Sequence, residues 1–397
     1  SYELATICTE APIEFSPDEC LWNNDYKPEL FGLFKKLGFN KFIEKWGIAE
    51  GDVPTIDAGF ERLAVIEDAS ADTIIAVVKA AEYVAVCEKD SFDELDICDG
   101  KNVYIAKWAL LGEGYDRLLK TVFSADVKKV SHNVKDLMRK LIDENLPLDG
   151  FIYDTALAAY LLDATESDYP LERISMGYCG TELSGAEAIW NVKKATETKL
   201  TEFNVDKLFY DIEMPLCEVL AQMEHEGFLV DRKALSEFGE SLNGSIESLR
   251  NDIWELAGGE FNINSPKQLG DVLFEKLMLP AGKKTKTGWS TNADVLDKLR
   301  GKHPIIEMIL DYRMLTKLKS TYADGLLKLI EKDGRIRTNF QMTVTATGRL
   351  SSTEPNLQNI PVRKELGSQI RKMFIAAPGK VLVDADYSQI ELRLLAH

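Results

Sequence analysis

Short apolar runs alternate with helical patterns between residues 60 and 200. The runs at residues 62–66, 83–86, 102–106 and 129–131 are bounded by polar residues, which predicts strands. Apolar residues at spacings of three and four predict helices over residues 71–81, 115–123 and 135–144. Strands that alternate with helices in this way predict an α/β domain.

A helical pattern takes over near residue 206. Apolar residues spaced four and three apart mark one face of a long helix, namely Leu208, Ile212, Leu216, Leu220 and Met223. This helix is expected to end near Gly227, and a second is expected between the capping residue Asp231 and the glycine pair 258–259. Such sustained spacings predict paired antiparallel helices. The Ser-Pro-Lys-Gln sequence at residues 265–268 predicts the start of another helix.

The period of the pattern changes to two around residue 335. Alternating apolar and polar residues from 336 to 344 predict strands of a third unit. Near the end of the sequence, apolar residues 381–383 predict another strand, followed by a turn and a helix over residues 388–395. The predicted fold class is therefore multidomain, with α/β and α+β parts.

The length of 397 residues exceeds one ordinary domain, and about 100 to 200 residues per domain suggests two to four. We expect a lead-in segment over residues 1–50, an α/β domain over 51–205, a helical domain over 206–330 and the opening of another over 331–397. The sequence starts with Ser1 and stops at His397 inside a helical pattern, so we expect both ends to be cut.

The composition is that of a folded protein, with 45% hydrophobic and 28% charged residues. The six cysteines form no Cys-x-x-Cys pair, which argues against a zinc or redox motif and favours reduced thiols. No apolar leader or long apolar segment is visible, so a cytoplasmic protein is expected.

The net charge of −18 argues by itself against a nucleic-acid partner, because such binding depends on Lys and Arg. Residues 1–260 carry 25 Lys and Arg against 51 Asp and Glu, whereas residues 261–397 carry 22 against 14. The first part would repel a polyanion and the second would attract one. A nucleic-acid site is therefore expected in the second part.

Two carboxylates, Asp384 and Asp386, follow the strand predicted at residues 381–383. A carboxylate fixed at the end of a strand can hold Mg²⁺, and phosphoryl transfer uses two such ions about 3.5–4 Å apart. Both side chains would lie on the same face of a strand, so the spacing leaves open which one binds metal. An isolated Asp after a strand is more often a turn residue or helix cap, and only a longer motif favours a metal site.

Such a motif is present. Residues 386–393, Asp-Tyr-Ser-Gln-Ile-Glu-Leu-Arg, resemble the first palm motif of the family A DNA polymerases, most closely that of the bacterial DNA polymerase I group. The resemblance continues at residues 283–288, 312–322, 347–352 and 355–363. It is specific over residues 206–397 and weaker before them. It implies a truncated large-fragment portion with a ribonuclease H-like vestigial exonuclease domain, a helical thumb and the start of the palm.

The resemblance also implies roles for residues of the palm motif. Asp386 would bind both catalytic metal ions with its carboxylate, and Tyr387 would add its main-chain carbonyl. Glu391 would crowd a ribose 2′-hydroxyl and so select deoxynucleotides. The other nucleotide-binding residues would be Ser388, Gln389 and Ile390.

Further palm residues are implied to contact DNA or nucleotide. Arg349 and Arg363 would lie beside the primer end and the incoming nucleotide, where Arg349 can donate to minor-groove acceptors present on every base pair. Gln358 and Asn359 would contact DNA. Outside this motif, each arginine would be interpreted as an ordinary surface charge.

Lys283, Lys284 and Lys286, with Thr287, form a compact cationic loop in the helical domain. Lysines and hydroxyls suit contacts with phosphates. A run of lysines alone is more often a solvated face. The charge division of the chain and the resemblance to a thumb that holds duplex DNA favour a DNA contact here.

The front half resembles a 3′–5′ exonuclease domain that has lost its metal ligands. The Asp-x-Glu pair that such a site needs after its first core strand is replaced by Cys87 and Lys89, and Leu137 occupies the ligand place of a second motif. A lysine ammonium cannot ligate Mg²⁺. We therefore expect no exonuclease metal and no nuclease activity, which leaves the domain as a scaffold.

The resulting hypothesis is a DNA-directed DNA polymerase, a nucleotidyltransferase of replication and repair in the bacterial cytoplasm, associated with the nucleoid. Its partners would be primer–template DNA and deoxynucleoside triphosphates, its cofactor two Mg²⁺ ions, and it would be a monomer. This portion alone is expected to hold no Mg²⁺ firmly and to be inactive, because one carboxylate cannot hold both ions. The alternative is a non-catalytic DNA-binding or scaffold fragment. A working proofreading nuclease is opposed by Cys87 and Lys89.

Overall fold

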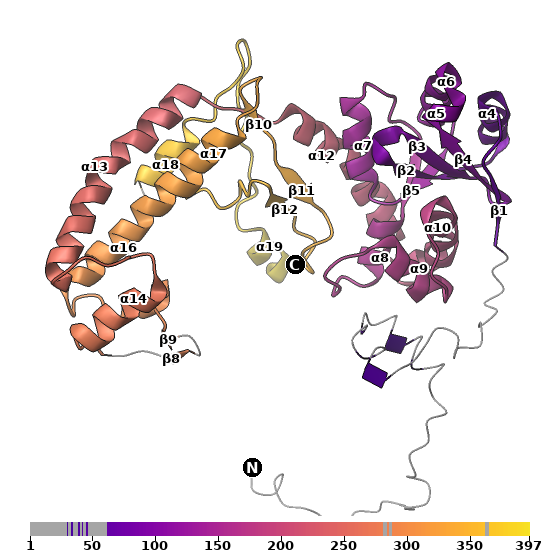
Figure 1. Ribbon diagram of the computed structural model, residues 1–397. Helices are drawn as coiled ribbons and strands as arrows, with labels where there is room; N and C mark the ends of the chain where they lie inside the picture. The colour runs from indigo at the N-terminus through magenta and orange to yellow at the C-terminus, as the bar shows by residue number, and fades with distance from the viewer. Residues whose placement is uncertain are drawn as a thin grey trace, which may run out of the picture. The chain divides into compact units, whose positions relative to one another are not determined.

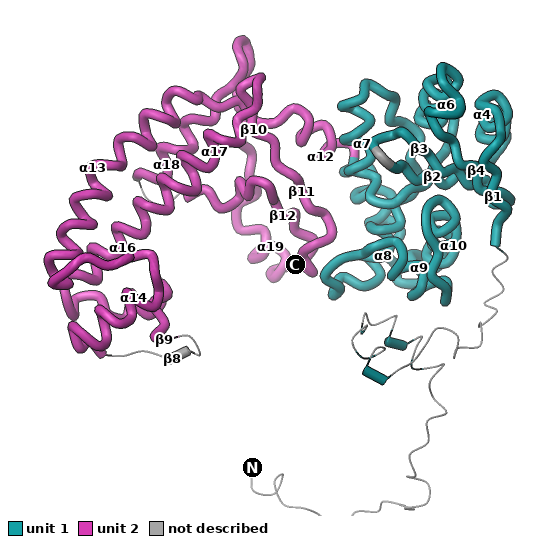
Figure 2. The backbone as a smooth tube through the Cα atoms, viewed as in Figure 1, with its two compact units in different colours: residues 1–217 teal, residues 218–397 magenta. Residues whose placement is uncertain are grey.

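The computed structural model describes most of the chain from residue 62 onward. Besides seven residues between 30 and 46, it describes residues 62–280, 284–285, 288–361 and 365–397; of residues 90, 284, 285 and 365 it describes the backbone only. The chain forms two compact units, residues 1–217 and 218–397 (Figure 2).

A six-stranded sheet forms the centre of the first unit (Figure 1). Its strands in spatial order are β1 (Ala64–Ile66), β4 (Asn102–Lys107), β3 (Glu94–Cys98), β2 (Val84–Lys89), β5 (Lys129–Ser131) and β6 (Phe151–Asp154). β3 runs antiparallel to both neighbours, and the other neighbouring pairs are parallel. The carboxyl ends of β2, β5 and β6 therefore meet at one edge, where sheets of this kind place their sites.

Helices cover both faces of this sheet (Figure 1). The helices of the first unit are α4 (Ala71–Ala80), α5 (Trp108–Leu111), α6 (Glu113–Val122), α7 (Val134–Asp143), α8 (Thr155–Leu162), α9 (Leu171–Cys179), α10 (Gly185–Glu202) and α11 (Asp206–Leu208). On one face Ile74 of α4, Leu118 of α6 and Leu141 of α7 share a core with Val86 and Ile97 of the sheet. On the other, α10 packs on β2, β3 and β5 and is flanked by α8 and α9. The α/β prediction is confirmed for this unit.

Every strand and helix predicted between residues 62 and 144 is present, with ends that differ by at most three residues. The sequence analysis missed β3, β6 and the helices α8 to α10. β3 was missed because Glu94 and Asp96 interrupt its apolar residues. α8 was missed because it is buried on nearly all sides and shows no polar face.

The second unit combines helices with small two-stranded sheets (Figure 1). Its helices are α12 (Met214–Glu226), α13 (Arg232–Ala257), α14 (Pro266–Gly270), α15 (Ala293–Lys298), α16 (Pro304–Lys317), α17 (Asp324–Leu329), α18 (Glu365–Arg371) and α19 (Ile390–Ala396). Its strands pair as β7 (Phe228–Leu229) with β10 (Arg335–Ile336), β8 (Lys284–Thr285) with β9 (Gly288–Trp289), and β11 (Asn339–Gln341) with β12 (Ser351–Thr353). The boundary between the units falls inside α12, after Cys217.

The helix ends predicted from capping residues are confirmed. The carboxylate of Asp231 accepts a hydrogen bond from the N–H of Ala234 at 2.9 Å, which starts α13. Gly258 ends α13 with a left-handed backbone (φ +67°) that glycine adopts without strain. The hydroxyl of Ser265 accepts from the N–H of Gln268 at the start of α14.

The long helix expected over residues 206–227 is also present, as α11, a π-helical stretch Phe209–Glu213 and α12. The prediction of antiparallel packing is right for α13, but its partner is α16 rather than the preceding helix. Leu235 near the start of α13 shares a core with Leu315, and Ile253 near its end shares one with Ile306. The two helical runs are separated by β7, which pairs with β10.

The structure contradicts the strand predicted at residues 381–383. Val381, Leu382 and Val383 are exposed by 80%, 57% and 84%, and they form no strand. A strand needs a neighbour for its backbone hydrogen bonds, and none of the described residues pairs with this segment. The helix expected from residue 388 begins at Ile390, because Gln389 before it has a left-handed backbone (φ 55°).

No helix in the described part of the chain is both long and apolar enough to cross a membrane. The described cysteines, Cys87, Cys98, Cys179 and Cys217, are free thiols.

Candidate active site

Asp384 and Asp386 lie in an exposed segment that leads into α19. Their carboxylate oxygens are accessible to a hard cation such as Mg²⁺, which prefers oxygen ligands. Within residues 62–280, 288–361 and 365–397, no group of three or more His, Cys, Asp or Glu side chains is arranged to hold a metal ion. The choice between the two carboxylates rests on the family resemblance, which favours Asp386.

The structure brings together two residues assigned to the palm. Nη2 of Arg349 donates a hydrogen bond to Oε1 of Glu391 at 2.8 Å, across 42 residues of sequence. Both side chains are exposed, by 74% and 69%. An ion pair exposed to water contributes only about 0.2–1 kcal/mol to the free energy of unfolding. We therefore expect this pair to affect the positions of the two side chains more than the stability of the fold.

Hydrogen bonds hold the main chain at Arg349 and at the residues that follow it. Oγ1 of Thr345 donates to the carbonyl oxygen of Arg349 at 2.6 Å. The side-chain amide of Gln358 donates to the carbonyl oxygen of Leu350 at 3.1 Å and accepts from the N–H of Ser352 at 3.2 Å. Gln358 was predicted to contact DNA, and in the structure both ends of its amide shape the loop that presents Arg349.

Buried polar contacts anchor this loop to the rest of the second unit. The hydroxyls of Ser352 and Thr338 lie 2.7 Å apart, and both side chains are buried. Glu224 of α12, only 5% exposed, accepts a hydrogen bond from the N–H of Phe340 in β11 at 2.7 Å. The sequence analysis missed Thr338 and Glu224, because a buried hydroxyl or carboxylate looks like any surface polar residue in a sequence.

The other residues predicted to bind nucleotide or DNA are partly described by the structure. Ser388, Gln389 and Ile390 lie at the start of α19 and are exposed. Asn359 is exposed, and its main-chain carbonyl accepts a hydrogen bond from the hydroxyl of Tyr322 at 2.5 Å. Four predicted residues lie outside the described residues, namely Arg363, Lys283, Lys286 and Thr287. Lys284 is described by its backbone in β8.

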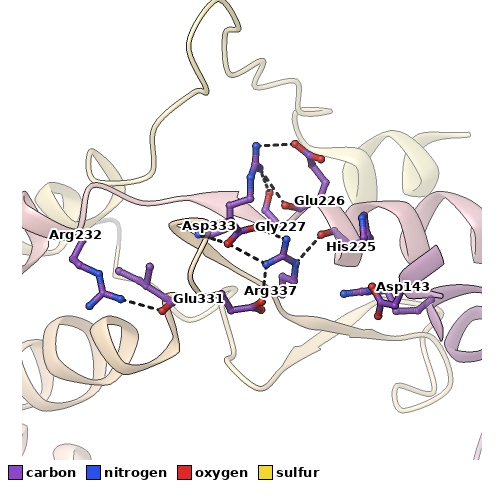
Figure 3. A network of polar contacts seen from close by, with 11 residues as sticks. Asp143, His225, Glu226, Gly227, Arg232, Glu331, Asp333 and Arg337 are labelled. Atoms are coloured by element: carbon purple, nitrogen blue, oxygen red, sulfur yellow. Dashed lines mark hydrogen bonds and ion pairs between the residues drawn. The ribbon is translucent and has the colours of Figure 1, made fainter. Parts of the chain in front are cut away.

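Two arginines that the sequence analysis did not single out close the carboxyl end of α12 (Figure 3). Nη1 of Arg335 donates to the carbonyl oxygens of Glu226 and Gly227, both at 3.1 Å. Nε of Arg337 donates to the carbonyl oxygen of His225 at 2.7 Å. The last carbonyls of a helix lack partners within the helix, so these contacts fix where α12 ends.

In the first unit, the three positions predicted to have lost metal ligands come together. Cys87, Lys89 and Leu137 line one pocket of about 630 Å³ at the carboxyl ends of β2 and β5. Further charged and titratable residues line the same pocket, namely Glu88, His132, Asp136, Lys140 and Glu172. The structure thus places the three substituted positions in one site, although they are far apart in the sequence.

Acidic residues of β3 hold the ammonium of Lys89. Its Nζ lies 2.7 Å from Oδ2 of Asp96 and 3.1 Å from Oε1 of Glu94. Burial alone lowers the pKa of Lys89, but hydrogen bonds to the two carboxylates outweigh it and raise that pKa above its ordinary value. The pocket therefore contains a fixed cation where the resemblance places a ligand of Mg²⁺.

Two other groups in this pocket are uncharged at neutral pH. Burial raises the pKa of the Cys87 thiol to about 11. Burial lowers the pKa of His132 to about 4, and its Nδ1 lies 2.9 Å from Oγ1 of Thr155. A protonated thiol is a poor nucleophile and a poor metal ligand, so Cys87 brings neither chemistry to the pocket.

Comparison with known protein families gives a match for part of the chain. Residues 232–397, which include most of the second unit and the Asp386 segment, match DNA polymerase family A.

Over its whole length the chain is similar to DNA polymerase I from several bacteria. DNA polymerase I of Geobacillus stearothermophilus is 37% identical over an alignment of 433 residues, which covers 100% of this chain and 48% of that protein. DNA polymerase I of Bacillus subtilis (strain 168) is 37% identical over 432 residues, with the same coverage. The chain spans about half the length of the curated relatives it matches.

A similar solved structure is the POL domain of Pol1 from M. smegmatis, in complex with DNA primer-template and dNTP. It shares 34% sequence identity with this chain and superposes with a TM-score of 0.75. The match covers 85% of this chain and 62% of that one.

Proposed function

We propose that the protein containing this chain is a DNA-directed DNA polymerase that extends a primer by copying a template. The observation that carries the proposal is the match to DNA polymerase family A over residues 232–397, which include Asp386, Arg349 and Glu391. The primer 3′-oxygen would attack the α-phosphate of a deoxynucleoside triphosphate, and pyrophosphate would leave. The M. smegmatis relative bound to primer-template and dNTP supports these partners.

The proposed subdivision follows the sequence predictions. Residues 51–205 would form a ribonuclease H-like domain of the exonuclease type, residues 206–330 a thumb, and residues 331–397 the first part of a palm, after a lead-in over 1–50. The mixed sheet with helices on both faces supports the first assignment. The antiparallel pair α13 and α16 supports the second. We further propose that the protein acts as a monomer in the bacterial cytoplasm, at the nucleoid.

Mg²⁺ is the metal that fits the palm donors. Asp386 offers exposed carboxylate oxygen atoms, and Mg²⁺ completes its shell with waters and substrate phosphates, so one carboxylate can begin a site. We assign Asp386 and the main-chain carbonyl of Tyr387 as ligands, as the resemblance implies. Bound there, the metal would stabilise negative charge on the transferring phosphate.

The other palm residues would bind the nucleotide and the primer end. Glu391 would exclude a ribose 2′-hydroxyl, and Arg349 would donate to the minor groove at the primer end. Ser388, Gln389 and Ile390 would line the nucleotide site at the start of α19. Arg363 keeps its predicted role beside the incoming nucleotide.

We also propose that the first unit has no 3′–5′ exonuclease activity. The support is the fixed ammonium of Lys89, paired with Asp96 and Glu94 in the pocket that a nuclease would fill with metal ions. Two-metal hydrolysis needs carboxylates that face the metals, not a cation among them. The unit would then act as a scaffold for the rest of the protein.

Primer extension tests the polymerase assignment. Asp386→Asn should lower kcat by about three orders of magnitude, because charge stabilisation by the metal is worth several kcal/mol. Asp384→Asn is the matched control and should retain most of the activity. Binding of primer–template, measured by fluorescence anisotropy, should be unchanged in both variants.

Two other outcomes of the primer-extension test would change the proposal. Loss of activity in Asp384→Asn with full activity in Asp386→Asn would reverse the assignment of the metal ligand. No extension by the unsubstituted protein, with DNA binding intact, would favour a non-catalytic DNA-binding module instead.

A further inference from the structure

Arg349 and Glu391 meet although 42 residues separate them in the sequence, with Nη2 of the arginine 2.8 Å from Oε1 of the glutamate. We propose that Arg349 is a positioning residue for the Glu391 carboxylate, so that selection of deoxynucleotides over ribonucleotides depends on both residues. This inference rests on the proposed function and deepens it. Arg349 would thereby acquire a second role besides its contact with the primer end.

A side chain that excludes a hydroxyl group by its bulk must be held in one place. Glu391 lies in the first turn of α19 and is 69% exposed, so packing restricts it little. A glutamate in that setting populates several staggered rotamers. An ion pair with the guanidinium of Arg349 favours the rotamers that keep the carboxylate near this arginine.

The backbone that carries Arg349 is held by hydrogen bonds. The main-chain carbonyl of Arg349 accepts from the hydroxyl of Thr345, and the next carbonyl accepts from the amide of Gln358. Gln358 also accepts from the N–H of Ser352, whose own hydroxyl is buried. A chain of hydrogen bonds thus runs from the interior of the unit to the loop that carries Arg349, and positional control of this kind depends on such support.

Holding Glu391 leaves Arg349 with donors for DNA. A guanidinium has five N–H groups in a planar fork, and the contact with Glu391 uses Nη2. Nε and Nη1 remain as donors for minor-groove acceptors at the primer end. Bound DNA and nucleotide would exclude water and strengthen the ion pair, because Coulomb attraction increases as the effective dielectric constant falls. The carboxylate would therefore be held most firmly when the substrates are present.

The test is sugar selectivity in primer extension by the protein that contains this chain. Selectivity is the ratio of kcat/KM for dCTP to kcat/KM for CTP. Arg349→Met and Glu391→Gln should each lower this ratio about tenfold, chiefly through a lower KM for CTP. Glu391→Gln keeps the size of the side chain and removes its charge. The double variant should lose no more selectivity than either single variant, because both remove the same interaction.

The control is Arg371→Met, which removes an exposed arginine from α18 and should leave the ratio unchanged. An equal loss with both nucleotides in Arg349→Met overturns the inference and leaves the polymerase assignment standing. If a variant extends too slowly, the affinities for dCTP and CTP on a dideoxy-terminated primer give the same comparison. Absence of extension by the unsubstituted protein overturns the proposed function, and the inference with it.

Discussion

Nζ of Lys89 lies 2.7 Å from Oδ2 of Asp96, a residue that is only 5% exposed. The other oxygen of this carboxylate, Oδ1, has no hydrogen-bond partner among the described residues. Lys89 therefore provides the main compensation for a buried negative charge. Lys89 should therefore contribute to the stability of the sheet.

Replacing Lys89 should destabilise the first unit. Lys89→Met should lower the free energy of unfolding by about 1–3 kcal/mol, because Asp96 would remain buried without its counter-ion. Lys107→Met is the matched control, since Lys107 pairs at 3.3 Å with Glu94, which is more exposed than Asp96. It should cost less than about 1 kcal/mol. Urea unfolding measures both, and equal effects would contradict this role of Lys89.

The same pocket should lack nuclease activity. Incubation of the chain with 3′-labelled single-stranded DNA and Mg²⁺ should release no labelled nucleotide, because we propose that Lys89 and Cys87 stand in the places of metal ligands. Trimming that requires Mg²⁺ and disappears in a Lys89 variant would show that the site is active. Trimming that persists in this variant would point to a contaminating nuclease.

Lys129 should make the stability of the first unit depend on pH. It is fully buried, Nζ donates to the carbonyl oxygens of Ser124 and Asp149, and burial lowers its pKa to about 7. Because the unfolded lysine stays protonated up to about pH 10.4, this group binds more protons in the unfolded state between pH 7 and that value. Its contribution to stability therefore rises with pH across that window.

Comparison with Lys129→Met isolates this effect from other titrating groups. Between pH 7 and pH 9, the original protein should gain up to about 2 kcal/mol of unfolding free energy relative to the variant. Urea unfolding at the two pH values gives the difference. A constant difference between the two proteins would mean that the lysine keeps its proton in the folded state.

The cationic loop should account for part of DNA affinity. Alanine at Lys283, Lys284 and Lys286 should weaken binding of duplex DNA and make the plot of log K against log salt less steep, by up to about 0.9 per lost phosphate contact. Alanine at two exposed lysines elsewhere in the second unit, Lys328 and Lys332, is the control and should have little effect. Fluorescence anisotropy at two salt concentrations measures both. Unchanged DNA binding in the loop variant would contradict the assignment of these three lysines to DNA binding.

The elements that could be predicted from the sequence are those with a local signal. The strand at residues 129–131 and the caps Asp231 and Gly258 were predicted at the right residues, because apolar runs and capping chemistry act over a few positions. The strand predicted at residues 381–383 failed because a strand also requires a partner. β3 was missed because Glu94 and Asp96 interrupt its apolar residues, and the pattern of residues does not reveal that both carboxylates pair with Lys89 of β2.

For the candidate site, too, predictions could be made where the sequence carries a local motif, but not where residues meet across the fold. The roles of Asp386 and Glu391 were predicted from one continuous motif, and the loss of nuclease ligands at Cys87 and Lys89 was predicted from another. The contact between Arg349 and Glu391 joins loop and helix across the fold, and its sequence signal is too weak to predict. Gln358 was assigned to DNA by resemblance, whereas the structure shows its amide engaged with the protein backbone.

The position of α12 also has a consequence for the integrity of the chain. Proteases cut most readily at exposed, irregular loops. The boundary between the two units has no such loop, because it falls within a helix next to the buried Cys217 and the helix is closed by Arg335 and Arg337. A protease would have to unwind α12 before it could separate the units at this boundary, so limited digestion should begin elsewhere in the chain.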